Sequence, residues 1–313
     1  MGRIALPSGR IGFLQLPQIG DGPSRDVVML HGLGANSGFW YASAVQWVRR
    51  FGRVTLFDLP GHGESDMPQS GYTPERLAGV LRELLDHLQI GRAHLIAHSF
   101  GGVVALCFAA RQPDRVKSLV LADTRLWAVE PPNCPAETNF WIERFRDAGL
   151  NIADSPRDLS VQLLVELARL RLEEGNFAAV AVRLPGASRL FAGRRVAQKW
   201  LKLIETTTAY DEMTDPAGLT LGEVASIQQP ILAVYGGQSA RKRSAFALQR
   251  SCSRCQLHMI PNAGHFFPLT RPGLFARVAL PFLGSAGDRK VGGPQPPPLA
   301  ASLPDLPRAE TVL

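Results

Sequence analysis

Residues 92–111 have the sequence RAHLIAHSFGGVVALCFAAR, an apolar strand followed by a serine, a phenylalanine, two glycines and an apolar helix. Ser99 lies where the strand pattern ends and the helical pattern begins. The stretch resembles the G-x-S-x-G nucleophile elbow, a sharp strand-to-helix turn that lifts the serine Oγ to the edge of a sheet. Ala97 replaces the first glycine of that motif, and Gly101 is the second. The alternative is that Ser99 only caps the helix.

Short apolar strands alternate with helical segments on both sides of this stretch. An opening hairpin is expected over 3–6 and 10–16, and further strands at 26–30, 53–58, 92–98, 116–122, 230–235 and 256–260. Strands that alternate with helices form parallel sheets covered on both faces. The fold class is therefore predicted to be α/β, a mostly parallel sheet flanked by helices.

The alternation stops over a stretch of about one hundred residues. Segment 125–225 is rich in helix formers and has no convincing strand. We interpret it as a helical cap inserted into one α/β domain, whose two parts are 1–124 and 226–284. The remaining segment, 285–313, is rich in proline and predicted to be a flexible tail.

Composition and charge limit the classes of function. The chain has 313 residues, of which 45% are hydrophobic and 19% charged, as in a globular protein. The net charge is +7, but segment 226–284 alone holds seven basic residues and no acidic one, while the rest of the chain is balanced. The excess is therefore local, and no nucleic-acid partner is expected.

The sequence gives no indication of a targeting segment or a metal site. The first residues contain no continuous apolar region, and no run approaches the roughly 18 residues of a membrane span, so we expect a cytoplasmic protein. Cys252, Cys255 and His258 form a C-x-x-C-x-x-H run, but a closed zinc site needs a second pair of ligands, and none is found. No oligomeric state is indicated.

Two further loops are expected at the same sheet edge as Ser99, because each follows a core strand. In His31-Gly32-Leu33-Gly34, the glycines allow a backbone N–H group to point inward. The N–H groups of Leu33 and Phe100 are the candidate oxyanion-hole donors. His265, in the sequence PNAGH after the last strand, is the candidate general base.

Together, these motifs resemble the α/β-hydrolase family, in particular its helical-capped serine esterases, lactonases and carbon–carbon hydrolases. The resemblance covers 27–283 and rests on His31-Gly32, the segment DLPGHGES at 58–65, the Ser99 turn and Gly264-His265. It implies an α/β-hydrolase fold and a serine hydrolase that cleaves an ester, lactone or thioester through an acyl-enzyme, without a cofactor. Branches with an aspartate nucleophile are disfavoured because residue 99 is serine.

The third member of the expected triad is missing from its usual place. The family leads one to expect an acidic residue shortly after the strand 230–235, where this chain has Ser239, and segment 226–284 contains no carboxylate at all. Asp123, at the end of the preceding strand, is the candidate acid. The alternatives are a carboxylate of the cap, such as Asp211 or Asp215, and no acid at all.

Two features bear on the substrate. Arg241, Lys242 and Arg243 begin the helix after the vacated position, where an anionic substrate group, coenzyme A or an acyl carrier protein is expected to approach; a solvated helix start is the alternative. The aromatic residues of the cap either line an acyl pocket or form the core of the cap; they are Phe140, Trp141, Phe177 and Trp200.

Three functions follow from these residues. The leading hypothesis is a serine hydrolase that acts on a small acyl substrate. An acyltransferase or thioesterase that uses acyl groups bound to coenzyme A or a carrier protein is the second. The third is a ligand-binding protein on a hydrolase scaffold without useful turnover, since a histidine without an orienting carboxylate loses its fixed tautomer.

Overall fold

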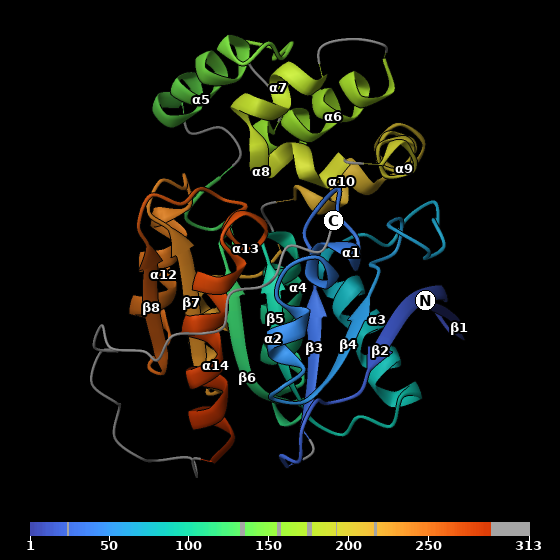
Figure 1. Cartoon of the computed structure of the whole chain (residues 1–313), viewed down its shortest axis with the longest axis vertical. Coiled ribbons are helices and arrows are strands. Elements are labelled where there is room, and N and C mark those ends of the chain that lie inside the picture. Colours follow the sequence, from blue (N-terminus) through green and yellow to red (C-terminus); the bar gives the residue numbers. More distant parts are fainter. Residues whose placement is uncertain are drawn as a thin grey trace.

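A computed structural model describes residues 1–23, 25–131, 135–154, 158–173, 177–191, 193–215 and 218–288. Its centre is a single sheet with the strand order β1-β2-β4-β3-β5-β6-β7-β8 (Figure 1). Strands β1 and β2 form the expected hairpin, and β2 runs antiparallel to β4. All later neighbours are parallel, as predicted. The strands are β1 (Gly2–Leu6), β2 (Gly9–Leu16), β3 (Asp26–Leu30), β4 (Arg53–Phe57), β5 (Ala93–His98), β6 (Val116–Ala122), β7 (Ile231–Gly236) and β8 (Cys255–Ile260).

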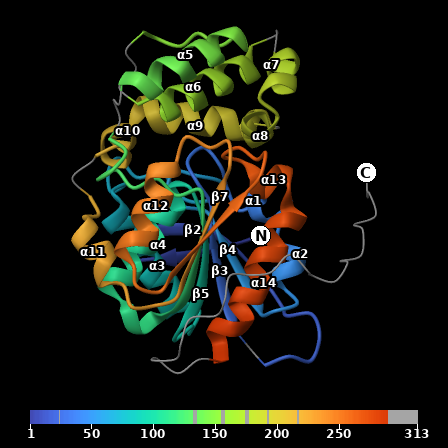
Figure 2. The same cartoon turned by 90° about the vertical axis from the view of Figure 1, so that its left-hand side faces the viewer.

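Helices cover both faces of this sheet (Figure 2). One face carries α3 (Pro74–His87), α4 (Phe100–Arg111), α11 (Leu221–Ser226) and α12 (Lys242–Ser251). The other carries α1 (Gly38–Tyr41), α2 (Val45–Val48), α13 (Phe267–Thr270) and α14 (Pro272–Asp288). The central strands β3 to β7 are almost fully buried on both faces, which explains why their sequences are largely apolar rather than alternating.

The chain between β6 and β7 is helical in its described part, as predicted. Most of its helices lie above the ends of the parallel strands, at the top of Figure 1, and we call this group the helical layer. The last helix of this stretch, α11, packs instead against α4. The domain boundaries drawn at 124/125 and 225/226 stay predictions. The helical layer consists of α5 (Pro135–Asp147), α6 (Leu159–Leu172), α7 (Phe177–Arg183), α8 (Pro185–Ser188), α9 (Arg194–Thr206) and α10 (Ala209–Met213).

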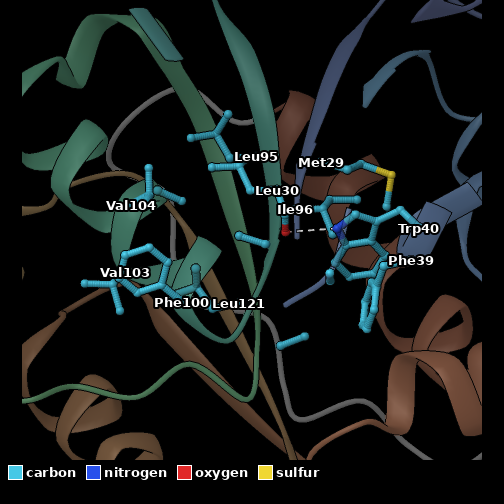
Figure 3. Close-up of a cluster of buried hydrophobic side chains, with 14 of the residues drawn as sticks. Met29, Leu30, Phe39, Trp40, Leu95, Ile96, Phe100, Val103, Val104 and Leu121 are labelled. Carbon is cyan, nitrogen blue, oxygen red and sulfur yellow. Dashed lines mark hydrogen bonds between the residues drawn. The ribbon is translucent and has the colours of Figure 1, made fainter. Parts of the chain in front are cut away.

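The core is built from both sides of the central strands (Figure 3). Met29 and Leu30 of β3 are fully buried, and Trp40 packs beside them. The Trp40 indole N–H donates a hydrogen bond of 2.9 Å to the Leu30 carbonyl oxygen, which satisfies the one polar atom that this side chain takes into the core. Phe100 and Val103 of α4 fill the other side.

Four histidines are also buried in the sheet region, and burial lowers the pKa of each. The pKa of His31 falls to about 4, and that of His62 falls to about 3, helped by the neighbouring His31. His94 has a pKa of about 3, and its Nδ1 lies 2.8 Å from the Ser118 Oγ on the next strand. The pKa of His98 lies well below its usual value. All four side chains are therefore neutral at neutral pH.

None of the helices in the described ranges combines the length and the apolar character that crossing a membrane would require.

The close packing of α4 on β3 can be tested at Gly101. A Cβ atom there would lie 2.4 Å from the His31 carbonyl oxygen and 2.9 Å from that of Leu30, and backbone atoms cannot give way. Gly101→Ala is expected to lower the free energy of unfolding by about 1–3 kcal/mol or more, measured by urea denaturation. Gly79→Ala in α3 is the control, because a Cβ there meets nothing within 4 Å and gains up to about 1 kcal/mol of helix propensity. Equal effects at the two sites would contradict this packing.

The buried histidines predict that acid destabilises the protein. Below a pH of about 6.5 the unfolded chain protonates these side chains while the folded chain does not, so the free energy of unfolding falls as the pH falls. Each histidine contributes up to about 1.4 kcal/mol per pH unit. Urea denaturation between about pH 7 and about pH 5 measures the slope, and His94→Gln is expected to make it shallower. A free energy of unfolding that stays constant over this range would refute the prediction.

Candidate active site

Ser99 occupies a strained turn between β5 and α4. Its φ of 54° and ψ of −121° are rare for a residue with a side chain, and such strain persists only where the surroundings enforce it. The Ser99 N–H donates to the Ala122 carbonyl oxygen at 2.9 Å, and the Ser99 carbonyl accepts from the Gly102 N–H at 2.9 Å. Gly32 leaves room for the turn, because a Cβ on it would lie 3.1 Å from the Ser99 Cβ.

His265 lies in the loop between β8 and α13 and faces Ser99. Its Nε2 is 3.1 Å from the Ser99 Oγ, and its Nδ1 is 3.0 Å from the Asp123 Oδ1. The ring is partly accessible, with 27% of the side chain exposed, whereas the Asp123 side chain is fully buried. The structure thus brings Ser99, His265 and Asp123 into one continuous chain of hydrogen bonds.

The loop that carries His265 is held from two sides. Gln238 donates its N–H to the Ala263 carbonyl oxygen at 2.9 Å, and a side chain at Gly236 would collide with that oxygen at 2.3 Å. From the other side, His98 Nε2 donates to the His265 carbonyl oxygen at 3.0 Å, while its ring stacks on Phe39. No local sequence pattern indicates this role of His98, although the residue directly precedes Ser99.

Asp123 directly follows β6 and lies in the left-handed backbone region, with a φ of 52°. Its Oδ2 accepts a 2.8 Å hydrogen bond from the Gly236 N–H on β7. Its Oδ1 accepts from the Ser239 hydroxyl as well as from His265. Ser239 stands where the family resemblance leads one to expect a carboxylate. It donates a hydrogen bond to the Asp123 carboxylate, which lies one strand away.

Two neutral histidines hold the loop at Leu33. The Leu59 N–H donates to His31 Nε2 at 3.1 Å, so the proton of that ring is on Nδ1, which donates to the Gly32 carbonyl oxygen at 2.8 Å. The Gly34 N–H donates to His62 Nε2 at 3.3 Å. Because the C=O and N–H of a trans peptide point in opposite directions, the bond to Gly32 also fixes the direction of the Leu33 N–H.

Phe100 completes this part of the site. It is the first residue of α4, and a helix leaves its first N–H groups without partners inside the helix. Leu33, Phe100, Ser99 and His265 all line a cavity of about 880 Å³. The residues that carry the candidate oxyanion donors and the hydrogen-bonded serine therefore line the same cavity.

The cavity lies between the sheet edge and the helical layer, and its walls are largely apolar. Phe140 and Trp141 are among its lining residues, whereas Phe177 and Trp200 are not. Trp200 is buried in the helical layer and lines a separate cavity of about 270 Å³. Two of the four aromatic residues considered from the sequence thus reach the cavity.

The basic residues at the start of α12 also differ in whether they line the cavity. Arg241 and Arg243 line the cavity, and Lys242 does not. Arg241 donates to the Ser160 hydroxyl at 2.6 Å and lies 3.6 Å from the Glu130 carboxylate, so this guanidinium already has an acidic partner.

The cysteine run lies outside this cavity. Cys252 and Cys255 are buried free thiols, and burial raises their pKa values to about 11 and about 12. Across the described ranges, no three histidine, cysteine or acidic side chains are grouped so that they would hold a metal ion.

Several curated proteins are similar to this chain. It is 34% identical over 193 residues to a pimeloyl-(acyl-carrier protein) methyl ester esterase of Chromobacterium violaceum, which is 56% of this chain and 72% of that protein. It is 28% identical over 248 residues to a poly(3-hydroxyalkanoate) depolymerase of Ectopseudomonas oleovorans, 78% of this chain and 79% of that protein. Other matches are local: the chain spans 22% of an abhydrolase domain-containing protein of Caenorhabditis elegans and 29% of uncharacterised mycobacterial proteins.

Solved structures give the same fold. The enol-lactonase from Burkholderia xenovorans LB400 superposes with a TM-score of 0.64 at 22% identity, over 90% of this chain and 100% of that chain. The family model described as alpha/beta hydrolase fold matches residues 27–272. The chain therefore belongs to the α/β-hydrolase fold family.

Proposed function

We propose that this protein is a serine hydrolase that cleaves a carboxylic ester, lactone or thioester. The observation that carries the proposal is the chain of hydrogen bonds from Ser99 through His265 to Asp123 at the wall of a large, mainly apolar cavity. Nucleophile, base and orienting carboxylate in this order are what acyl transfer through a covalent intermediate requires.

In the proposed reaction, His265 Nε2 takes the proton of Ser99 as its Oγ attacks the substrate carbonyl carbon. The negative charge that forms on the carbonyl oxygen is stabilised by the N–H groups of Leu33 and Phe100. His265 then protonates the leaving alcohol or thiol, and the acyl group stays on Ser99. Water, activated by the same histidine, releases the acid and restores the serine. Asp123 keeps the His265 proton on Nδ1 and stabilises the imidazolium.

The contacts of Asp123 support it as the acid in preference to the carboxylates of the cap. Asp211 and Asp215 are absent from the cavity lining, whereas Asp123 is in direct contact with His265. The Gly236 N–H and the Ser239 hydroxyl both donate to the Asp123 side chain and hold it in place beside His265.

The relatives support the ester class, since one is an esterase and another a depolymerase by name. The helical layer is proposed to act as a cap, whose inner side chains enclose the acyl part of the substrate. Transfer of the acyl group to an acceptor other than water uses the same intermediate, so an acyltransferase is the variant of this function that product analysis would reveal.

A fluorophosphonate probe tests the nucleophile. We expect stoichiometric labelling of the wild type, because the probe reacts with an activated serine, and complete loss of labelling in Ser99→Ala, measured by intact-protein mass spectrometry. Ser160→Ala removes another hydroxyl of the same cavity and is expected to keep the labelling. A wild type that stays unlabelled from about pH 6 to about pH 9 would support the ligand-binding protein and overturn the hydrolase.

The position of the acid is tested by moving it. Asp123→Asn is expected to lower kcat on a p-nitrophenyl ester by about 10⁴-fold, the loss seen in the chymotrypsin-type triad when the histidine tautomer is no longer fixed. Adding Ser239→Asp to that variant places a carboxylate beside the same histidine, and part of the activity is expected to return.

Asp211→Asn serves as the control and is expected to leave kcat unchanged. Circular dichroism and urea denaturation confirm that each variant is folded. Unchanged turnover in Asp123→Asn would exclude this residue as the acid, and a large loss in Asp211→Asn would point to the helical layer instead.

A further inference from the structure

The charged side chains around the cavity differ in how they are neutralised. The deeper pair, Arg125 and Arg241, is largely buried and matched by acids. Arg125 lies 2.9 Å from the Asp158 carboxylate, and Arg241 lies 3.6 Å from that of Glu130. Burial, and then the nearby Arg241, lower the pKa of Arg125 to about 10, which shows how closely these charges are packed. Their positive charge is balanced within the protein.

Three other arginines that line the cavity are exposed and lack such partners. They are Arg144 of α5, Arg183 of α7 and Arg271, which follows α13. Arg144 lies over the Trp141 ring at 5.8 Å, and Arg183 donates to the Asp147 backbone carbonyl oxygen. Among the side chains that the structure describes, no carboxylate comes within ion-pair distance of any of the three. We call these three residues the arginine rim.

The interior between these charges is apolar. Phe145, Leu163, Leu164 and Leu190 line the cavity and are buried. An acyl chain in this space would be removed from water, with a gain of about 0.8 kcal/mol for each buried methylene group. The cavity thus combines a buried apolar lining with exposed, positively charged arginine side chains.

From this arrangement, which rests on the proposed function, we propose that the natural substrate is an ester or thioester that carries a negatively charged carboxylate or phosphate group. That group is held at the arginine rim while the apolar part of the substrate lies in the cavity. Guanidinium groups bind both anions through paired hydrogen bonds. Because the three exposed arginines come from separate segments around one cavity, their fields add there and attract anions.

This arrangement also changes which basic residues matter for the substrate. Of the cluster noted in the sequence, Arg241 has its own acid, Arg243 lines the cavity but is engaged in another contact, and Lys242 lies outside the cavity lining. The arginine rim comes instead mainly from the helical layer. Lys242 is therefore a matched control, because its loss removes one positive charge from the same side of the protein without removing a cavity contact.

The experiment uses thioesters that share a six-carbon acyl chain and differ in where they carry negative charge. Hexanoyl-N-acetylcysteamine is neutral, adipoyl-N-acetylcysteamine carries a carboxylate on the acyl side, and hexanoyl-coenzyme A carries phosphates on the thiol side. Release of the thiol gives kcat/KM for the wild type, for Arg144→Gln, Arg183→Gln and Arg271→Gln, for the triple variant, and for Lys242→Gln.

We expect the wild type to prefer at least one anionic thioester, mainly through KM. Each single variant is expected to reduce that preference about threefold, since exposed charge pairs are individually weak, and the triple variant about tenfold or more. Lys242→Gln is expected to change it less than twofold, and added salt is expected to weaken it. The substrate that shows the effect identifies the side of the scissile bond that carries the anion.

Equal losses on neutral and charged thioesters in the triple variant, or an equal loss in Lys242→Gln, would overturn the proposal. Binding separates this outcome from failure of the proposed function. Calorimetric titration of the folded Ser99→Ala variant with the same thioesters needs no turnover. If the variant binds anionic thioesters through the arginine rim but the wild type shows no turnover, the hydrolase is refuted and the anion site is supported. If the wild type turns over thioesters without any charge preference, the hydrolase is supported and the anion site is refuted.

Discussion

The carboxylate of Asp123 connects the parts of the site. It accepts hydrogen bonds from Gly236 on β7, from Ser239 in the following loop and from His265 after β8. The segment at 236–239 and the loop at His265, which are distant in sequence from Asp123 and from each other, therefore meet at one buried side chain. Such a group is costly to bury unless its oxygens are satisfied, so the donors must be in place for the fold as well as for the chemistry. The tight turn at Ser99 and the loop that carries His265 are both arranged around this point.

Much of this could be predicted from the sequence, because parallel strands have one edge where their following loops meet. The turn at Ser99, the loop at Leu33 and the loop at His265 each follow a core strand, and the predicted sheet places them together. Asp123 could be inferred from the absence of carboxylates in the last part of the core. Their catalytic roles stay predictions until the variants are measured.

Other features depend on contacts that no local pattern reveals. The bond from His98 to the His265 carbonyl joins residues that are 167 positions apart. In the sequence, Ser239 stands where the family resemblance leads one to expect an acidic residue. The pairing of β6 with β7 brings its hydroxyl to Asp123, to which it donates a hydrogen bond. The packing of the helical layer decides which aromatic side chains line the main cavity. Phe140 and Trp141 line it, whereas Trp200 lines a separate one. Helical periodicity gives the apolar face of a helix but not its neighbour.

The pairing of β6 with β7 has a consequence for the order in which the chain folds during synthesis. Leu119 lies beside Ile231 in the sheet, so the whole helical layer must be made and looped out before these strands can join. Closing a loop of this length is entropically costly and slow compared with local folding. During synthesis, the turn at Ser99 emerges early, but the proposed general base, His265, is among the last residues of the core to leave the ribosome. In a nascent or truncated chain, Ser99 would therefore lack its proposed base. The proposed nucleophilic reactivity of Ser99 would begin only when the sheet is complete.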